Sequence, residues 1–254
     1  MSNREEGVVY VAFGWRHLVM AVHSAQSFRA ANPNRGITVV TNLDVTAADL
    51  PSFDSSTDRL TRLDVSDAMN RHFKTRAAQL TDYRRTLLLD ADTVVLGTLD
   101  VPFRLLDHAD VLLKLDPRGQ KRPWQRAEPI LGLGEMGELP AWNGGVVFFR
   151  EGEASRAFFQ SWNDCFLSRG SPYDQPALLE TSIVSPARVF PLDERWNCPT
   201  SRYRKTGGLS GGTKILHYMS DPPPETRVEL EQIARRFGDA AVAAAVSNVT
   251  QGDT

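Results

Sequence analysis

The chain has few cysteines, no long apolar run and no excess of charge of either sign. Its 254 residues include only Cys165 and Cys198, too few for the disulfide framework of a small secreted scaffold. Lys and Arg number 29 and Asp and Glu 31, so the net charge is −2. This balance argues against nucleic-acid binding, which depends on neutralising many phosphates. A chain of this length buries enough surface to fold without a metal or disulfide staple.

Membrane-spanning and targeting segments are also missing from the pattern. The apolar run at residues 8–13 follows a polar, acidic start and is far shorter than the roughly 20 apolar residues of a membrane helix. A secretory signal would need a basic start and a longer apolar core. No internal repeat or low-complexity linker is present. We therefore expect a cytoplasmic protein with reduced cysteines, no membrane span and no nucleic-acid partner.

What is present is the alternation of strands and helices that is typical of an α/β fold. Residues 7–13 form a continuous β-branched and aromatic run, residues 15–31 have apolar positions at helical spacing, and residues 36–40 are again apolar and β-branched. This β–α–β opening predicts a mixed, mainly parallel sheet flanked by helices. Ligands of such sheets bind outside the carboxyl ends of the strands, which directs attention to Gly14. No dinucleotide fingerprint G-x-G-x-x-G follows it.

Further elements are predicted along the rest of the chain. We expect strands at residues 86–89, 93–96, 111–114, 145–149, 188–190 and 214–216, and helices at 66–80, 153–167, 174–180 and 227–246, the last broken near 238. Residues 121–140 are rich in Gly, Pro and charge, which predicts a long surface excursion. The prediction is one domain over residues 1–254. Its nucleotide-binding half covers about 7–115, its acceptor half about 140–220, and its C-terminal helices about 224–247.

The acids Asp90 and Asp92 are the strongest chemical signal in the chain. They follow the apolar run at residues 86–89, and in extended chain their side chains point to the same face. Two adjacent carboxylates repel each other, and a hard divalent cation removes that repulsion. Taken alone, the pair has two interpretations: a site for a metal and a phosphate, or a capped turn.

At this point the chain resembles a known family. Residues 83–99 are similar to the D-x-D region of the A-type (GT-A) glycosyltransferases, in particular family 8, the glycogenin-like and bacterial galactosyltransferase-like proteins. Further matches follow in the family's order between Val8 and about Ser220. They are Lys74 in the preceding helix, residues 142–149 for F-N-[SA]-G-V, residues 174–178 for D-Q-x-x-[LF], residues 195–197 for W-N, and residues 214–217 for the strand ending in a metal-binding histidine.

The resemblance implies a Rossmann-like GT-A fold and a metal-dependent hexosyltransferase. Its donor would be a nucleotide-diphosphate sugar, with UDP the nucleotide that the family favours, and transfer would retain the anomeric configuration. Its acceptor, a small molecule, a glycan or a protein, is not identified by the motifs. Mn²⁺ or Mg²⁺ would be held by Asp90, Asp92 and His217.

The resemblance also implies roles for other residues around the donor. Ala12, Phe13 and Gly14 would contact the base and ribose. Asp90 or Ala91 would lie near the ribose.

Four more residues are implied at the sugar end of the donor. Lys74 would lie near the donor phosphate or sugar, and Asn143 and Asp174 would face the donor sugar and the acceptor. Gln175 belongs to the same expected donor site. Asp174 has two possible roles, stabilising the developing cation or attacking as a nucleophile.

The chain departs from the family after His217. Where the family continues H-x-x-G-x-x-K-P, this chain has Ser220 in place of the glycine and no lysine at that spacing. The basic residues Arg202, Arg204 and Lys205 lie just upstream. This departure supports one alternative function, a degenerate protein that binds a nucleotide sugar without catalysis. A second alternative is a sugar-1-phosphate nucleotidyltransferase, whose phosphate loop would have to be residues 13–16, a poor version of such a loop.

Overall fold

The structure, a computed structural model, describes residues 4–116, 129–205, 212–219 and 221–246. Their contacts divide the chain into two compact units. Unit 1 comprises the chain before residue 7 together with residues 71–88 and 100–194, and unit 2 comprises residues 7–70, 89–99 and the chain from 195 onward. The division of residues 1–254 proposed above, one domain with two functional halves, stays a prediction.

Unit 2 is built on the predicted β–α–β opening. Strand β1 (Arg4–Val11), whose residues from Gly7 belong to unit 2, pairs in parallel with β2 (Gly36–Thr41), and helix α1 (Gly14–Ala31) connects them. A third parallel strand, β3 (Arg59–Arg62), was not predicted, because its sequence Arg-Leu-Thr-Arg is polar and only partly buried. The sheet order in this unit is β1-β2-β3, and β2 is buried throughout.

A second, small sheet in unit 2 has the order β11-β12-β5. Strand β12 (Ile215–His217) runs parallel to β11 (Cys198–Pro199) and antiparallel to β5 (Thr93–Val95). The register pairs His217 with Thr93 on one side and with Pro199 on the other. This pairing brings the chain near residue 217 beside the chain that follows Asp92.

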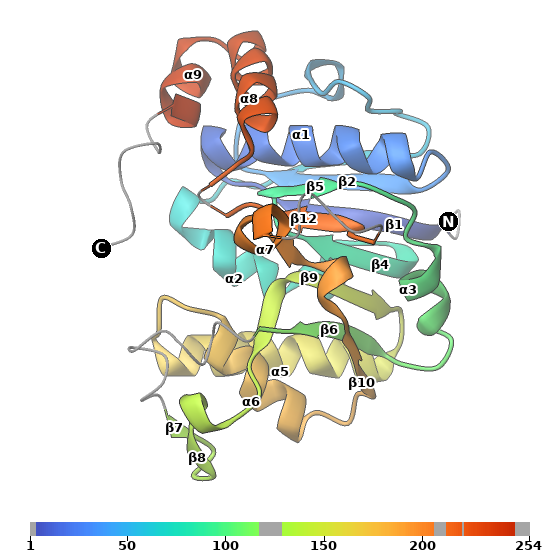
Figure 1. Cartoon of the computed structure of the whole chain (residues 1–254), viewed down its shortest axis with the longest axis vertical. Coiled ribbons are helices and arrows are strands. Elements are labelled where there is room, and N and C mark those ends of the chain that lie inside the picture. The colour runs from blue at the N-terminus through green and yellow to red at the C-terminus, as the bar shows by residue number, and fades with distance from the viewer. Residues whose placement is uncertain (1–3, 117–128, 206–211, 220, 247–254) are drawn as a thin grey trace. The chain divides into compact units, whose positions relative to one another are not determined.

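The C-terminal helices pack on α1 (Figure 1). They are α8 (Pro224–Arg236) and α9 (Asp239–Val246), and Gly238 between them has a φ of +90°. The predicted break at this glycine is therefore confirmed, because few other residues adopt that conformation. A short helix, α7 (Thr200–Lys205), follows β11.

In unit 1 the strand order is β10-β6-β9-β4. These strands are β10 (Val189–Leu192), β6 (Val111–Leu115), β9 (Trp142–Arg150) and β4 (Tyr83–Leu89); β10 and β6 are parallel, and β6 and β9 antiparallel. Helices α5 (Glu153–Arg169) and α6 (Gln175–Val184) pack against each other, and α6 also packs on β9 (Figure 1). Helix α6 is longer than the 174–180 segment that the sequence predicted.

The predicted helix at residues 66–80 is wrong. The chain instead forms two short 3₁₀ turns, η2 (Asp67–Met69) and η3 (Ala77–Gln79), on either side of helix α2 (Asn70–Lys74). The Thr75 hydroxyl lies 2.8 Å from the carbonyl oxygen of His72 and 3.1 Å from Asn163 Oδ1. These side-chain hydrogen bonds compete with the helical pattern and end α2.

Shorter elements complete unit 1. They are α3 (Asp100–Leu105), β7 (Pro129–Ile130), β8 (Gly134–Glu135) and the 3₁₀ turn η4 (Met136–Glu138). Of the expected surface excursion at residues 121–140, residues 121–128 lie outside the described part of the chain. Within its remaining part, β7 and β8 form a small hairpin. Across the described ranges, every helix is too short or too polar to cross a membrane.

Candidate functional site

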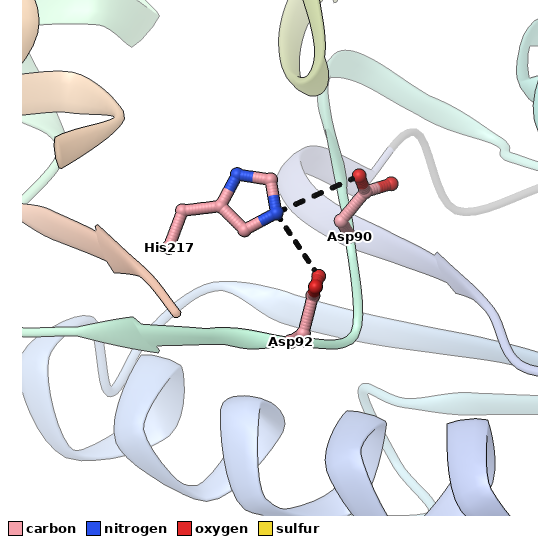
Figure 2. Close-up of side chains that lie close together, drawn as sticks. All are labelled: Asp90, Asp92 and His217. Atoms are coloured by element: carbon pink, nitrogen blue, oxygen red, sulfur yellow. Dashed lines mark hydrogen bonds and ion pairs between the residues drawn. The ribbon is translucent and has the colours of Figure 1, made fainter. Parts of the chain in front are cut away.

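Two carboxylates and one imidazole meet in unit 2. One ligand atom from each of Asp90, Asp92 and His217 lies within 4.8 Å of the other two. His217 Nε2 is 3.1 Å from Asp92 Oδ1 and 3.9 Å from Asp90 Oδ2. Figure 2 shows this nitrogen directed toward both carboxylates. The side chains of Asp90 and Asp92 are 27% and 23% exposed, whereas that of His217 is 6% exposed. The acids are thus open to a ligand from solution, while the imidazole is held by the protein.

Backbone and hydroxyl groups hold the acidic turn in place. The Thr93 hydroxyl donates to the carbonyl oxygen of Asp90 at 2.9 Å. The backbone N–H of Tyr218 donates to the carbonyl oxygen of Asp92 at 3.0 Å. Thr93 belongs to β5, and Tyr218 directly follows β12. The register of the small β11-β12-β5 sheet therefore determines the position of the two acids.

A buried chain of hydroxyl groups extends from this turn into α1 and β1. Ser24 Oγ lies 2.7 Å from Thr93 Oγ1 and 3.1 Å from the hydroxyl of Tyr10, and all three residues are fully buried. Because the single proton of Thr93 goes to the Asp90 carbonyl, Thr93 must accept from Ser24, and Ser24 from Tyr10. Burial raises the pKa of Tyr10, so this phenol stays a neutral donor.

Tyr218, next to His217, is a second buried phenol. Burial raises its pKa well above the usual value; the negative charge of Asp92 raises it too, while Arg16 lowers it. Its hydroxyl has no hydrogen-bond partner among the residues that the structure describes. Tyr218 therefore remains uncharged beside the acids.

The expected nucleotide edge, Ala12 to Gly14, is buried and internally bonded. The N–H of Ala12 donates to the Val40 carbonyl at 2.8 Å, that of Phe13 to Asn70 Oδ1 at 3.2 Å and that of Gly14 to Asn42 Oδ1 at 2.9 Å. These three N–H groups are satisfied within the protein. A ligand at this edge would therefore contact atoms of these three residues other than their backbone N–H groups.

Gly14 is a position where glycine is required. Its φ is +77°, and a Cβ atom there would overlap the carboxylate of Asp67. Asn42 also binds Asp67, with Nδ2 2.7 Å from Oδ1. Sequence reasoning missed the polar side chains Asn42, Asp67 and Asn70, although Asn42 directly follows the buried strand β2 and could have been found from that placement.

The expected sugar-binding residues lie in unit 1. Lys74 Nζ lies 3.4 Å from Asp174 Oδ2, and both side chains are almost buried, 12% and 11% exposed. Asp174 stands at the N-cap of α6, yet its carboxylate makes no capping hydrogen bond. The backbone carbonyl of Asp174 instead accepts from Trp162 Nε1 at 3.0 Å. The carboxylate is thus directed toward Lys74 and is not used to start the helix.

Asp116 lies beside two of the expected residues, and sequence reasoning missed it. Its Oδ2 lies 3.5 Å from Asn143 Nδ2 and 3.3 Å from Gln175 Nε2, and Asp116 and Asn143 are both buried. Asn143 Oδ1 accepts from the N–H of Gly145 at 2.8 Å, which orients the amide. The signal that was available is position: Asp116 comes directly after the buried strand β6.

The predicted site residues therefore fall into two sets. Unit 2 holds Asp90, Ala91, Asp92 and His217 with the strand end formed by Ala12, Phe13 and Gly14, and unit 1 holds Lys74, Asn143, Asp174 and Gln175. In unit 2 the structure brings together Asp90, Asp92 and His217, and in unit 1 it pairs Lys74 with Asp174 and places Asn143 and Gln175 on Asp116.

The family follows from comparison with known proteins. The sequence pattern of the nucleotide-diphospho-sugar transferases matches residues 41–182, more than half of the chain. The chain belongs to the nucleotide-diphospho-sugar transferase family. The matched segment of this transferase includes Asp90, Asp92, Asn143, Asp174 and Gln175. No curated protein matches the chain.

Solved structures show the fold of this transferase. The galactosyltransferase LgtC, solved with donor and acceptor sugar analogs, is 15% identical, with a TM-score of 0.63 over 97% of this chain and 98% of that chain. GlyE from Streptococcus pneumoniae TIGR4 is 16% identical, with a TM-score of 0.59 over 94% of this chain and 63% of that chain. Mouse xyloside xylosyltransferase 1 is 12% identical, with a TM-score of 0.53 over 87% of this chain and all of that chain.

These findings confirm several of the expectations. The fold is the GT-A glycosyltransferase fold, with a mixed, mainly parallel sheet flanked by helices. The resemblance to family 8 and the assignment as a nucleotide-sugar-dependent glycosyltransferase are confirmed as well.

Proposed function

We propose that this transferase is metal-dependent and moves a sugar from a UDP-sugar to an acceptor hydroxyl with retention of configuration. The observation that carries the metal dependence is the convergence of Asp90, Asp92 and His217 in a chain of this family. UDP and retention rest on the resemblance to family 8.

The donor set fits a divalent cation. Two carboxylate oxygens suit Mg²⁺ and Mn²⁺, and the imidazole nitrogen of His217 favours Mn²⁺ over Mg²⁺. The two acids are partly exposed, which leaves room for phosphate oxygens of a ligand. When bound, the cation would neutralise the charge that develops on the departing diphosphate.

The site residues of unit 1 would act on the sugar. In the reaction the bond between C1 and the diphosphate oxygen breaks, the electron pair leaves with UDP, and the acceptor oxygen bonds to C1 as its proton is lost. Lys74 offers a positive charge for the leaving phosphate or the sugar. Asn143 and Gln175, both bonded to Asp116, offer amide groups for sugar hydroxyls. Asp174 would face C1, as the stabiliser of its positive charge or as the nucleophile.

The base and ribose would lie at the end of β1. There Ala12, Phe13 and Gly14 lead into α1, and Asp90 or Ala91 would approach the ribose. The two cysteines are free thiols, which supports a reducing, cytoplasmic location.

Calorimetric titration of UDP with and without Mn²⁺ tests this proposal. We expect binding that requires Mn²⁺ and that is lost in Asp92→Asn, because the amide cannot supply the second negative ligand. The exposed acid Asp44 gives a matched control, and Asp44→Asn should bind as the wild type does. Equal binding of UDP by Asp92→Asn would overturn the assignment of the metal site.

Product analysis separates the proposed glycosyltransferase from the two alternative functions. A glycosyltransferase releases UDP from a UDP-sugar, whereas a sugar-1-phosphate nucleotidyltransferase releases pyrophosphate from a nucleoside triphosphate and a sugar phosphate. Binding of UDP-sugar with no release of UDP, over a broad screen of acceptors, would indicate a degenerate binding protein. The anomeric configuration of the glycoside, read by NMR, tests retention.

A further inference from the structure

We propose that Asn197 is a positioning residue that holds His217 in the tautomer required of a metal ligand. Asn197 Oδ1 lies 3.0 Å from His217 Nδ1, on the side of the ring opposite to Nε2, which faces the two acids. Both residues are buried, with 1% and 4% of their surfaces exposed. This inference deepens the proposed function and rests on its assignment of His217 to the metal site.

The small sheet of unit 2 explains how this contact arises. Asn197 immediately precedes β11, and β11 pairs in parallel with β12, Cys198 opposite Leu216 and Pro199 opposite His217. On its other edge β12 pairs with β5, which follows Asp92 directly. The imidazole is therefore held between two side chains, Asn197 and Asp92, each of which directly precedes one of the strands that pair with β12.

The chemistry of the contact selects one form of the imidazole. A carbonyl oxygen of an amide can only accept a hydrogen bond, so Nδ1 must carry the proton and donate it to Asn197. In a neutral imidazole the lone pair is then on Nε2, the nitrogen beside Asp90 and Asp92. A partner on the far nitrogen of a metal-binding histidine fixes both the tautomer and the ring orientation in this way.

The test compares Asn197→Leu, which has similar size but no acceptor, with Asn197→Asp, which keeps an acceptor oxygen. Asn32 in the same unit is also a buried asparagine, 2% exposed and bonded to the N–H of Leu99, so Asn32→Leu is the matched control for general destabilisation. Two quantities are measured for each variant. One is the affinity for Mn²⁺ alone, and the other is the protonation of His217 Nδ1 in metal-free protein, read by ¹⁵N NMR and assigned by comparison with His217→Gln.

We expect wild-type His217 to carry its proton on Nδ1, and Asn197→Leu to lose roughly 10- to 100-fold in Mn²⁺ affinity. Asn197→Asp should retain the Nδ1 proton and affinity within a few-fold of wild type, and Asn32→Leu should leave both unchanged. Unchanged affinity in Asn197→Leu, or an unprotonated Nδ1 in the wild type, would overturn the role of Asn197. If the wild type itself binds no Mn²⁺ through His217, the proposed metal site fails instead, and the NMR measurement distinguishes the two results.

Discussion

Single residues in this transferase make contacts that their local sequence does not predict. Asp174 would ordinarily be interpreted as a helix cap, since it precedes Gln-Pro at the start of α6. Its carboxylate makes no capping hydrogen bond and pairs with Lys74 instead. A nearly buried charge pair that is not needed to start a helix is available for a substrate, and this is why Lys74 offers the most direct test of unit 1.

Replacing Lys74 with methionine removes the positive charge and keeps the length of the side chain. We expect kcat to fall by roughly 10²- to 10³-fold, because the variant lacks the preorganised positive charge that would stabilise the departing group. Lys74→Arg should recover part of the rate. Release of UDP from the donor gives the rate, and titration of Mn²⁺ gives the control, since the proposed cation ligands lie in unit 2. A kcat close to wild type in Lys74→Met would contradict the role assigned to Lys74.

At the scale of elements, hydrogen bonds between elements hold the acidic turn. The hydroxyl chain from Tyr10 through Ser24 to Thr93 joins β1, α1 and β5, and it ends on the carbonyl of Asp90. Of these three residues only Thr93 lies in a motif segment, residues 83–99, and the motif gives it no role. Each is nevertheless fully buried with a polar group that must find a partner.

Ser24→Ala interrupts this chain in the middle. We expect a loss of about 1–3 kcal/mol in the free energy of unfolding, because the buried hydroxyls of Tyr10 and Thr93 both lose a partner. Urea unfolding measures the change. Ser168→Ala, which removes an exposed hydroxyl from α5, should change stability by less than about 0.5 kcal/mol. Equal effects of the two substitutions on the free energy of unfolding would show that the buried chain of hydroxyl groups does not stabilise the fold.

An ion-pair cluster joins three strands of unit 1 at their ends. Burial by itself would raise the pKa of Asp110, but hydrogen bonds from Arg188 and from Arg150 outweigh it and lower this pKa to about 2. Arg150 ends β9, whereas Asp110 and Arg188 directly precede β6 and β10. The side chain of Asp110 is 7% exposed, whereas those of Arg150 and Arg188 are 37% and 59% exposed, so the carboxylate is buried and its two partners reach into solvent.

The stability that Asp110 contributes should depend on pH. A carboxyl whose pKa is lower in the folded than in the unfolded chain stabilises the fold above pH 4 and loses that effect as the pH falls toward 2. We expect Asp110→Asn to cost about 2 kcal/mol at pH 7. The difference from wild type should shrink as unfolding is measured at progressively lower pH below 4. A difference that stays constant down to pH 2.5 would contradict this account of the cluster.

At the scale of the whole molecule, metal and nucleotide should stabilise the fold by binding it and not the unfolded chain. We expect Mn²⁺ with UDP at about 100 times its dissociation constant to add about 2.7 kcal/mol to the free energy of unfolding. Hydrogen exchange should show the added protection in residues 89–99 and 215–219 of unit 2. Asp92→Asn under the same conditions should show neither effect. Protection confined to residues 100–194, which belong to unit 1, would contradict binding of the nucleotide in unit 2.

Much of the fold was predictable from apolar periodicity alone. The strand and helix at the start of the chain, the buried strand before Asp90 and the break at Gly238 all appear where the sequence predicted them. The failure at residues 66–80 is equally instructive. Helical periodicity there is overridden by the tertiary hydrogen bond from Thr75 to Asn163, a residue 88 positions further along the chain.

The sequence by itself identified Asp90 and Asp92 as candidate site residues and, through its ordered motifs, the family to which this transferase belongs. Local order was enough, because both acids stand two residues apart at the end of one strand. The motifs also predicted His217 beside them, but only the tertiary structure decided the other distant polar partners of the site residues, Asn197 and Asp116. His217 is 125 positions from Asp92 and 20 from Asn197, and Asp116 lies 59 positions from Gln175. Such contacts depend on strand order and register, which bring side chains together with no trace in the residues between them.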